Sequence, residues 1–303
     1  MYRDSETWAF TFAIPLSNWY NPSAEGSGGS GVQAIHENLE LELGARWKPY
    51  LVGTGSLLPT GTTLRFLLAN ASAKEYSNAQ IDDYRGMPRR RFAWHPPLRL
   101  TVRARFSAPA GKLQGTAGFG FWNDPFLMSG ARVPTLPRAI WYFYSSPPSN
   151  MKLDLKTPGH GWKAATLDAL RPAAALWAPI APIAVALMNL RPVYQMIWPP
   201  IQQSLKIREA IIPVDMTQWH TYVLDWGVET SHFSLSSLAP NSKPLLTAPS
   251  PRGPLGFVMW MDNQYLVATP WGQIRWGMLD AEEGQWMEVD WFAVEPSQAG
   301  NRI

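Results

Sequence analysis

The stretch Leu98-Arg-Leu-Thr-Val-Arg-Ala-Arg-Phe106 decides the fold of this chain. Its apolar residues occupy every second position, and three arginines and a threonine fill the positions between them. Because successive side chains of a β-strand point to opposite sides, one side of this segment must be buried while the other meets solvent. The stretch therefore predicts a strand on the surface of a half-buried sheet.

Similar short apolar or alternating runs recur along the chain, and clusters of Pro, Gly, Asn and Ser separate nearly all of them. They cover residues 63–69, 97–106, 115–122, 139–144, 219–226, 257–261 and 286–294. The composition is that of a folded protein, with 46% hydrophobic and 16% charged residues and 16 tryptophans. Many strands with few helical periods predict an all-β fold, a sandwich of two antiparallel sheets.

Residues 164–212 depart from this pattern because they are apolar and rich in proline. The uncharged run from Pro172 to Leu190 approaches the roughly 20 residues that a membrane-spanning helix needs. Pro179 and Pro182 lie inside the run and tend to kink or end a helix. We therefore expect a helical insertion of two or three short helices rather than a span. The insertion either packs on the sandwich as a lid or offers an apolar surface to a ligand or membrane.

The first residues suggest a further division of the chain. The Gly/Ser run 26–31 has the composition of a flexible linker, and it separates residues 1–25 from the expected jelly-roll sandwich of residues 32–303. Residues 1–25 are either fused or relocated by design, or joined by a natural loop. The amino terminus is not typical of a signal peptide, so we expect either a cytoplasmic or membrane-peripheral location or the earlier removal of a targeting segment.

Composition excludes several classes of site. The chain has no cysteine, so disulfides and thiolate metal sites are absent, and its 5 histidines show no metal-binding spacing. The formal charge of +3 comes from scattered basic residues, and the one dense run is the short segment 89–91. No basic stripe or nucleic-acid motif accompanies that run, so nucleic acid is not an expected partner.

Four phrases, taken in order, resemble the laminarinase-like and agarase-like glycoside hydrolases of family 16. They are the paired segments Tyr76–Tyr84 and Leu98–Gly111, then Gly118-Phe-Gly-Phe-Trp-Asn-Asp124, Trp219-His-Thr-Tyr-Val-Leu-Asp-Trp226 and Trp286-Met-Glu-Val-Asp-Trp-Phe-Ala-Val294. The resemblance spans about residues 39–296. It implies a concanavalin A-like jelly roll. It also implies a structural calcium ion on the convex side, for which Asp290 is the candidate ligand.

The same resemblance implies that hydrolysis is lost. The family's catalytic strand carries Glu-x-Asp-x-x-Glu, and a β-bulge brings all three carboxylates to the concave face. Here the matching strand reads Ala139-Ile-Trp-Tyr-Phe-Tyr144, which places Ala139, Trp141 and Tyr144 at the three positions. None of these side chains supplies a carboxylate nucleophile or acid.

Two strand ends repeat an arrangement of Trp, Asn and Asp. They are Trp122-Asn123-Asp124 and Trp260-Met261-Asp262-Asn263. If both ends border one groove, Asp124 and Asp262 form a candidate acid/base pair. Asn and Asp are also common turn residues at strand ends, which is the alternative interpretation.

Three hypotheses follow, and the sequence leaves open whether the protein is an enzyme. The first is a non-hydrolytic binding protein whose aromatic groove holds an apolar or amphiphilic ligand, such as a lipid, an isoprenoid or a glycolipid. Its expected ligand-binding residues are Trp122, Asn123, Trp141, Tyr144, Trp260 and Asn263. The second is a diverged enzyme, acting on a glycan or as a cyclase or isomerase, that uses Asp124 and Asp262. The third is docking to a membrane or partner through the insertion.

Overall fold

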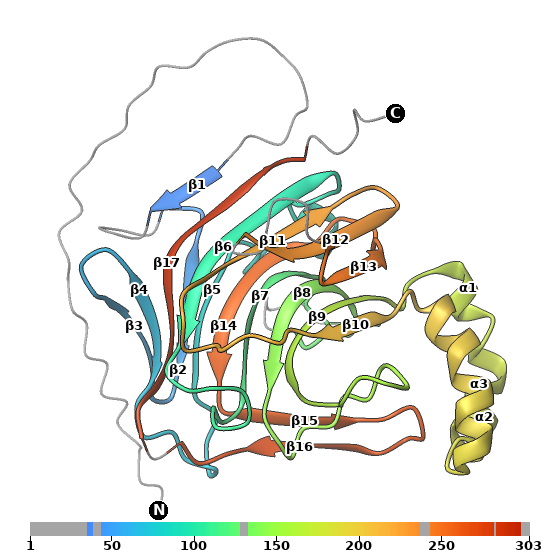
Figure 1. The fold of residues 1–303 in the computed structure, drawn as a ribbon. Helices are drawn as coiled ribbons and strands as arrows, with labels where there is room; N and C mark the ends of the chain where they lie inside the picture. The colour runs from blue at the N-terminus through green and yellow to red at the C-terminus, as the bar shows by residue number, and fades with distance from the viewer. Residues whose placement is uncertain (1–34, 39–43, 128–132, 237–242, 282, 298–303) are drawn as a thin grey trace, which may run out of the picture. The chain divides into compact units, whose positions relative to one another are not determined.

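Strand β6 (Leu98–Phe106) forms where the alternation predicts it, with every second side chain buried. The computed structural model describes residues 35–38, 44–127, 133–236, 243–281 and 283–297. Within these ranges two antiparallel sheets stack face to face (Figure 1). The predicted all-β sandwich is therefore confirmed. The segment 1–25 and the run 26–31 lie outside the described residues.

Strand β6 lies in an eight-stranded sheet with the order β13-β12-β11-β6-β17-β4-β3, in which β1 also pairs with β17. Its other strands are β1 (Ile35–Asn38), β3 (Gly55–Pro59), β4 (Leu64–Leu68), β11 (His220–Trp226), β12 (Thr230–Leu235), β13 (Leu246–Pro249) and β17 (Gln285–Pro296).

The second sheet has seven strands in the order β10-β9-β8-β7-β14-β5-β2. They are β2 (Lys48–Val52), β5 (Asn78–Asp82), β7 (Thr116–Trp122), β8 (Arg138–Ser145), β9 (Gly161–Asp168), β10 (Arg208–Ile211) and β14 (Gly256–Asp262). A separate hairpin consists of β15 (Gln264–Ala268) and β16 (Ile274–Met278). The basic run 89–91 forms the 3₁₀ turn η1 (Arg89–Arg91).

Aromatic rings from both sheets fill the core between them. Phe119 of β7 lies at the centre, with the rings of Tyr142, Trp162 and Tyr222 at centroid distances of 5.5, 5.8 and 5.3 Å. All four rings are almost completely buried. Replacing such a ring by alanine typically costs about 3–5 kcal/mol, so this cluster contributes strongly to holding the sheets together.

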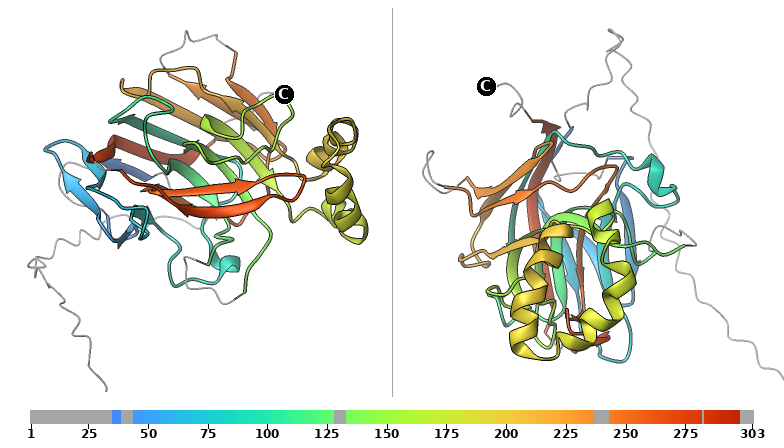
Figure 2. Two further views of the ribbon diagram at one scale, coloured as in Figure 1. Left: turned by 90° about the horizontal axis from the view of Figure 1, so that it is seen from below. Right: turned by 90° about the vertical axis from the view of Figure 1, so that its right-hand side faces the viewer.

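The proline-rich segment forms short helices beside the sandwich, as predicted (Figure 2). They are α1 (Pro172–Ala175), the 3₁₀ turn η2 (Ala178–Ile180), α2 (Ala181–Leu187) and α3 (Arg191–Ser204). Each α-helix has a proline at its first or second position, where a missing N–H is tolerated; these are Pro172, Pro182 and Pro192. Two further prolines, Pro199 and Pro200, lie inside α3, although proline was expected to end or kink helices.

No helix in the described part of the chain is long and apolar enough to cross a membrane. Helix α3 has 14 residues, which is short of the roughly 20 that a span requires. The helices instead pack on the sandwich through the buried residues Met188, Tyr194, Trp198 and Ile201. The segments of the predicted insertion that flank the helices form strands β9 and β10 of the seven-stranded sheet.

Candidate functional site

The seven-stranded sheet carries a cluster of large aromatic rings on the face that points away from the core, here called the outer face. Strands β7, β8 and β14 pair without any shift in register. Residues that oppose one another therefore share a face. This places Trp122, Trp141, Phe143 and Trp260 together on the outer face, and we call these four residues the aromatic cluster.

Glycines in β7 make room for these rings. Gly118 and Gly120 lie opposite Phe143 and Trp141 in the register of β7 and β8. A Cβ atom at Gly118 would lie 3.0 Å from the Cη2 atom of Trp260 and 2.3 Å from a backbone oxygen. At Gly120, where φ is 153°, it would lie 2.6 Å from the Cβ atom of Trp141. The sequence Gly-Phe-Gly thus provides a bare strip of backbone that the indole rings cover.

Trp141 lies in the middle of the aromatic cluster. Its ring centroid lies 5.3 Å from that of Phe143, 5.5 Å from that of Trp260 and 5.9 Å from that of Trp122. The three surrounding side chains are only 6–8% exposed, whereas Trp141 keeps partial exposure. Ring pairs at these separations contribute about 0.5–1.5 kcal/mol each. The cluster is therefore a packed aromatic layer, held rigid by its neighbours, with one accessible ring.

The indole N–H groups of the cluster also differ, because those of Trp122 and Trp260 are hydrogen-bonded whereas that of Trp141 is not paired with any described residue. The Nε1 atom of Trp122 donates to the hydroxyl of Tyr84 at 2.7 Å, and that of Trp260 donates to Oγ1 of Thr116 at 2.9 Å. Within the described ranges no acceptor pairs with Nε1 of Trp141. Trp141 thus combines a partly exposed aromatic ring with an indole N–H that these residues leave unpaired.

The structure does not bring Tyr144 to this face. Strand β8 pairs regularly with both β7 and β9, without the β-bulge that the family resemblance implied. Ala139 and Trp141 consequently face outward, whereas Tyr144 points into the core. Its hydroxyl donates to the carbonyl oxygen of Leu113 at 2.8 Å and accepts from the Gly111 N–H. Burial raises the pKa of this phenol, and its position is that of a core residue.

Asp124 and Asp262 lie at opposite ends of strand β7. Asp262 opposes Thr116 at one end of β7, and Asp124 follows Trp122 at the other. Six residues of strand separate these ends, which corresponds to about 20 Å. The structure therefore does not assemble the acid/base pair that the two similar sequence motifs suggested.

Both aspartates are buried and make hydrogen bonds within the fold. The Oδ1 atom of Asp262 accepts from Oγ1 of Thr116 at 2.8 Å and from the Gln264 N–H at 3.0 Å. Burial raises the pKa of Asp262 to about 6, although these hydrogen bonds oppose the rise. Asp124 is buried in a left-handed backbone conformation with φ of 49°, and its carbonyl oxygen accepts from Arg89 at 2.8 Å.

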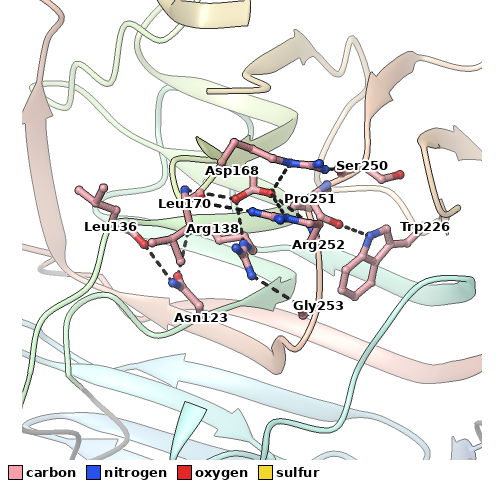
Figure 3. A network of polar contacts seen from close by, with 11 residues as sticks. Asn123, Leu136, Arg138, Asp168, Leu170, Trp226, Ser250, Pro251, Arg252 and Gly253 are labelled. Carbon is pink, nitrogen blue, oxygen red and sulfur yellow. Dashed lines mark hydrogen bonds and ion pairs between the residues drawn. The ribbon is translucent and has the colours of Figure 1, made fainter. Parts of the chain in front are cut away.

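The amides of Asn123 and Asn263 are engaged with the main chain. Asn123 donates to the carbonyl oxygen of Leu136 and accepts from the N–H of Arg138 (Figure 3). Asn263 donates to carbonyl oxygens of residues 72, 75 and 279 and accepts from the N–H of Ser77. Both side chains are at most 4% exposed. Their contacts tie loops to strand ends and leave little surface for a ligand.

Figure 3 also shows a buried carboxylate among arginines at the end of β9. Asp168 accepts from Nε of Arg138 at 2.9 Å and from Nε of Arg171 at 2.8 Å. Nε of Arg252 lies 3.8 Å from Oδ2 of the same carboxylate. These ion pairs connect β8, β9 and the loop before β14. The Asp168 cluster is therefore a structural junction at the rim of the core.

The carboxylates that face outward from the seven strands are Asp82, Asp262 and Glu209, as the strand registers show. Asp82 and Asp262 are four residues apart in register on paired strands, about 13 Å. Glu209 lies on β10, at least four strand spacings from either, or roughly 19 Å or more. Glycoside hydrolysis needs two carboxyl groups about 5 Å apart for retention and at most about 9.5 Å apart for inversion. The outer strand positions offer no such pair.

Asp290 does not fit the calcium site that the resemblance implied. A register shift between Val289 and Trp291 marks an irregularity in β17 at Asp290, whose carboxylate lies 2.8 Å from Nε of Arg103. A neighbouring guanidinium opposes cation binding. Among the described residues no group of three or more His, Cys, Asp or Glu side chains could hold a metal ion.

A buried ion pair on β9 and β10 escaped the sequence analysis. Nζ of Lys163 lies 2.7 Å from Oε2 of Glu209, and both side chains are at least nine-tenths buried. Burial raises the pKa of Glu209, although the Lys163 ammonium opposes the rise. Burial and the nearby carboxylates also raise the pKa of Tyr194 on α3 to about 12. The ion pair therefore lies near Tyr194 of α3, and Lys163 is the register partner of Phe143 in the aromatic cluster.

No protein-family model matches the chain, and no curated protein does. Several solved structures are similar to the chain in fold. They include a family 16 glycosyl hydrolase from Mycobacterium smegmatis, with a TM-score of 0.43, 12% identity and coverage of 88% of this chain and 100% of the other. An immunostimulatory antigen and pseudo β-1,3-glucanase of Mycobacterium tuberculosis has a TM-score of 0.47 and 12% identity, and the match covers 89% of this chain and 100% of the other. A β-1,3-1,4-glucanase (lichenase) from a mouse hindgut metagenome has a TM-score of 0.48 and 10% identity, and the match covers 88% of this chain and 100% of the other. At these identities the similarity concerns the fold alone.

Proposed function

We propose that this protein is a non-hydrolytic binding protein that holds a sugar ring against Trp141, as part of either a free glycan or an amphiphilic glycolipid. The observation that carries the proposal is the partial exposure of Trp141 at the centre of an otherwise buried aromatic cluster. A sugar ring has a flat apolar face that stacks on an indole, and its hydroxyl groups accept from an indole N–H.

The packing of the aromatic cluster favours binding at this point. Phe143, Trp122 and Trp260 fix the orientation of the Trp141 ring before any ligand arrives. Little side-chain freedom is then lost on association, which leaves more of the stacking energy for affinity. An isolated surface tryptophan would lack this advantage.

The spacing of the carboxylates supports binding without cleavage. Strand β8 presents Ala139, Trp141 and Phe143 outward, where an acid and a nucleophile would have to stand. Asp82, Asp262 and Glu209, the carboxylates at outward positions, are too far apart to act on one glycosidic bond. A ligand bound at Trp141 would therefore be released intact.

Binding to Trp141 is tested by titrating the protein with gluco-, galacto-, manno- and xylo-hexasaccharides and with octyl β-glucoside below its micelle concentration. Trp141→Ala should weaken binding at least about tenfold, the usual loss at a central aromatic contact. The matched control is Trp276→Ala, which removes an indole that is 68% exposed on β16. Binding of the hexasaccharides indicates a glycan ligand, and binding of octyl glucoside alone indicates a glycolipid. Equal losses in both variants, or preference for an alkyl chain without sugar, would overturn the proposal.

A second function, attachment to another surface through the helical insertion, is favoured by a different observation. Large apolar side chains of the insertion are exposed, among them Leu176 at 79% and Met196 at 70%. An apolar surface of this kind is typical of membrane or protein contact sites. Attachment would operate independently of sugar binding at Trp141.

A further inference from the structure

The helical insertion carries a series of exposed aliphatic side chains. They follow one another at intervals of four, three, four and three residues, from the C-cap of α1 to the N-cap of α3. Their exposed fractions are 79% for Leu176, 49% for Ile180, 64% for Ile183, 44% for Leu187 and 61% for Leu190. We call these five residues the aliphatic stripe.

The opposite side of the same helices is already used for packing. Ala184 and Met188 are buried, and Met188 packs with Tyr194 and Trp198 of α3. The insertion is also held by the β15–β16 hairpin, because Nδ2 of Asn189 donates to the carbonyl oxygen of Trp271 at 3.2 Å. A surface helix ordinarily turns a polar face to solvent once its apolar face is packed. Here the second face is apolar as well, which is typical of a surface that contacts a partner.

The segment between Asp168, which pairs with Arg171, and Glu209, which pairs with Lys163, carries charges of one sign. From residue 169 to residue 208 the charged residues are Arg171, Arg191, Lys206 and Arg208, and no acidic residue occurs. Arg191 and Arg208 are exposed. Aliphatic side chains combined with basic groups alone are complementary to a surface that is apolar beneath and anionic at its boundary.

We propose that the occupant of the aliphatic stripe is the surface of a lipid bilayer that contains anionic lipids. The inference rests on the proposed attachment function and identifies the surface that is bound. The helices lie in the interface rather than cross it, since α3 with 14 residues is about 21 Å long and the hydrocarbon core is about 30 Å thick. Leucine and isoleucine enter the boundary between headgroups and acyl chains, and the arginines contact the headgroups.

The composition of the stripe favours a bilayer over a protein partner. Energetically dominant residues of protein interfaces are enriched in Trp, Tyr and Arg, and leucine is under-represented among them. The stripe consists of leucine and isoleucine only, and the aromatic rings Tyr194 and Trp198 of α3 face inward. A lipid surface requires no shape-specific anchor and is satisfied by aliphatic area.

The test is co-sedimentation of the full chain with vesicles of phosphatidylcholine alone or mixed with 30% phosphatidylglycerol, at low and high salt. The wild type should bind the anionic vesicles at least about tenfold more tightly, and salt should weaken that binding. Ile183→Glu with Leu187→Glu should abolish binding. The matched control, Leu58→Glu with Val228→Glu, adds the same charge at exposed apolar positions outside the insertion and should bind like the wild type.

Two further readouts keep the outcomes distinct. Thermal unfolding should show that both double variants remain folded, because the substituted side chains are exposed. Sugar binding at Trp141 should be unchanged in both, so that loss of vesicle binding is separate from loss of the ligand site. No sedimentation of the wild type, equal losses in the two double variants, or a wild-type dimer that Ile183→Glu with Leu187→Glu converts to a monomer would overturn the bilayer proposal.

Discussion

At the scale of single residues, burial decides what the carboxyl groups of this protein do. Asp262 is 6% exposed, and its hydrogen bonds come from Thr116, Gln264 and Tyr76 rather than from a cation. Its raised pKa of about 6 is of the kind found at catalytic sites, where a proton must be exchanged. Because Asp124 lies at the other end of β7, the shift at Asp262 reflects burial in the fold and not a catalytic pair.

The raised pKa of Asp262 predicts how stability depends on pH. The folded protein holds this proton up to about pH 6, whereas an unfolded aspartate releases it near pH 3.9. The free energy of unfolding should therefore decrease as the pH rises from about 4 to about 6, and the destabilisation should be fully present above that range. Asp262→Asn should make the protein more stable than the wild type at pH 7, by about 1–3 kcal/mol.

Urea unfolding of both proteins between pH 4 and pH 7 measures this difference, which should vanish at the acid end. A slope from Asp83 remains in both proteins, because burial also raises the pKa of that residue to about 6. An Asp262→Asn variant that is less stable than the wild type at pH 7 would show that the ionised carboxylate stabilises the fold.

At the scale of elements, the ion pair between β9 and β10 shows how the sheet edge is held beneath the helices. Lys163 and Glu209 are almost completely buried, so removal of one partner leaves a charge without compensation. Lys163→Met should lower the free energy of unfolding at pH 7 by about 3–5 kcal/mol. The loss should shrink as the pH falls, because burial raises the pKa of Glu209 and this carboxyl group then protonates more readily.

The double substitution Lys163→Met with Glu209→Gln is the control, since it removes both charges. It should recover most of the stability lost in the single variant, as measured by urea unfolding. If the single and double variants are equally unstable, the loss arises from packing around the lysine stem rather than from the unpaired charge.

The sequence predicted elements well where only one face of a strand is buried. The alternation of Leu98–Phe106 located β6 because apolar and polar sides are distinct there. Strand β9 was missed, since most of Gly161–Asp168 is buried on both faces and shows no alternation, and it runs directly into the proline-rich segment. The ion pair of Lys163 and Glu209 was lost with it.

The candidate site was predicted in part for a similar reason. Trp122, Trp141 and Trp260 share the outer face, as expected, because they fall at outward positions of adjacent strands. Tyr144 was expected beside them because the resemblance implied a β-bulge, and β8 has regular pairing at this position. A one-residue difference in register moves a side chain to the opposite face. Backbone irregularities of that kind leave no signal in a single sequence.

At the scale of the sandwich and its insertion, the seven-stranded sheet brings together two surfaces with different chemistry. The aromatic cluster lies on the outer face of β7, β8 and β14, and the helices pack beside it through Leu167 of β9 and the loop residues Leu153 and Leu155. Attachment of the aliphatic stripe to a bilayer and stacking of a sugar on Trp141 would together hold the protein at a surface that carries glycans or glycolipids.

The central claim, binding of a sugar ring at Trp141 without cleavage, is tested most directly by the indole N–H resonances of ¹⁵N-tryptophan-labelled protein during titration with the four hexasaccharides. The Trp141 resonance, assigned with Trp141→Phe, should shift on saturation with at least one of them. The hydrogen-bonded N–H groups of Trp122 and Trp260 should change far less, and chromatography should recover the sugar at its full length. A Trp141 resonance that stays unmoved by every sugar, or recovery of shortened products, would contradict the account.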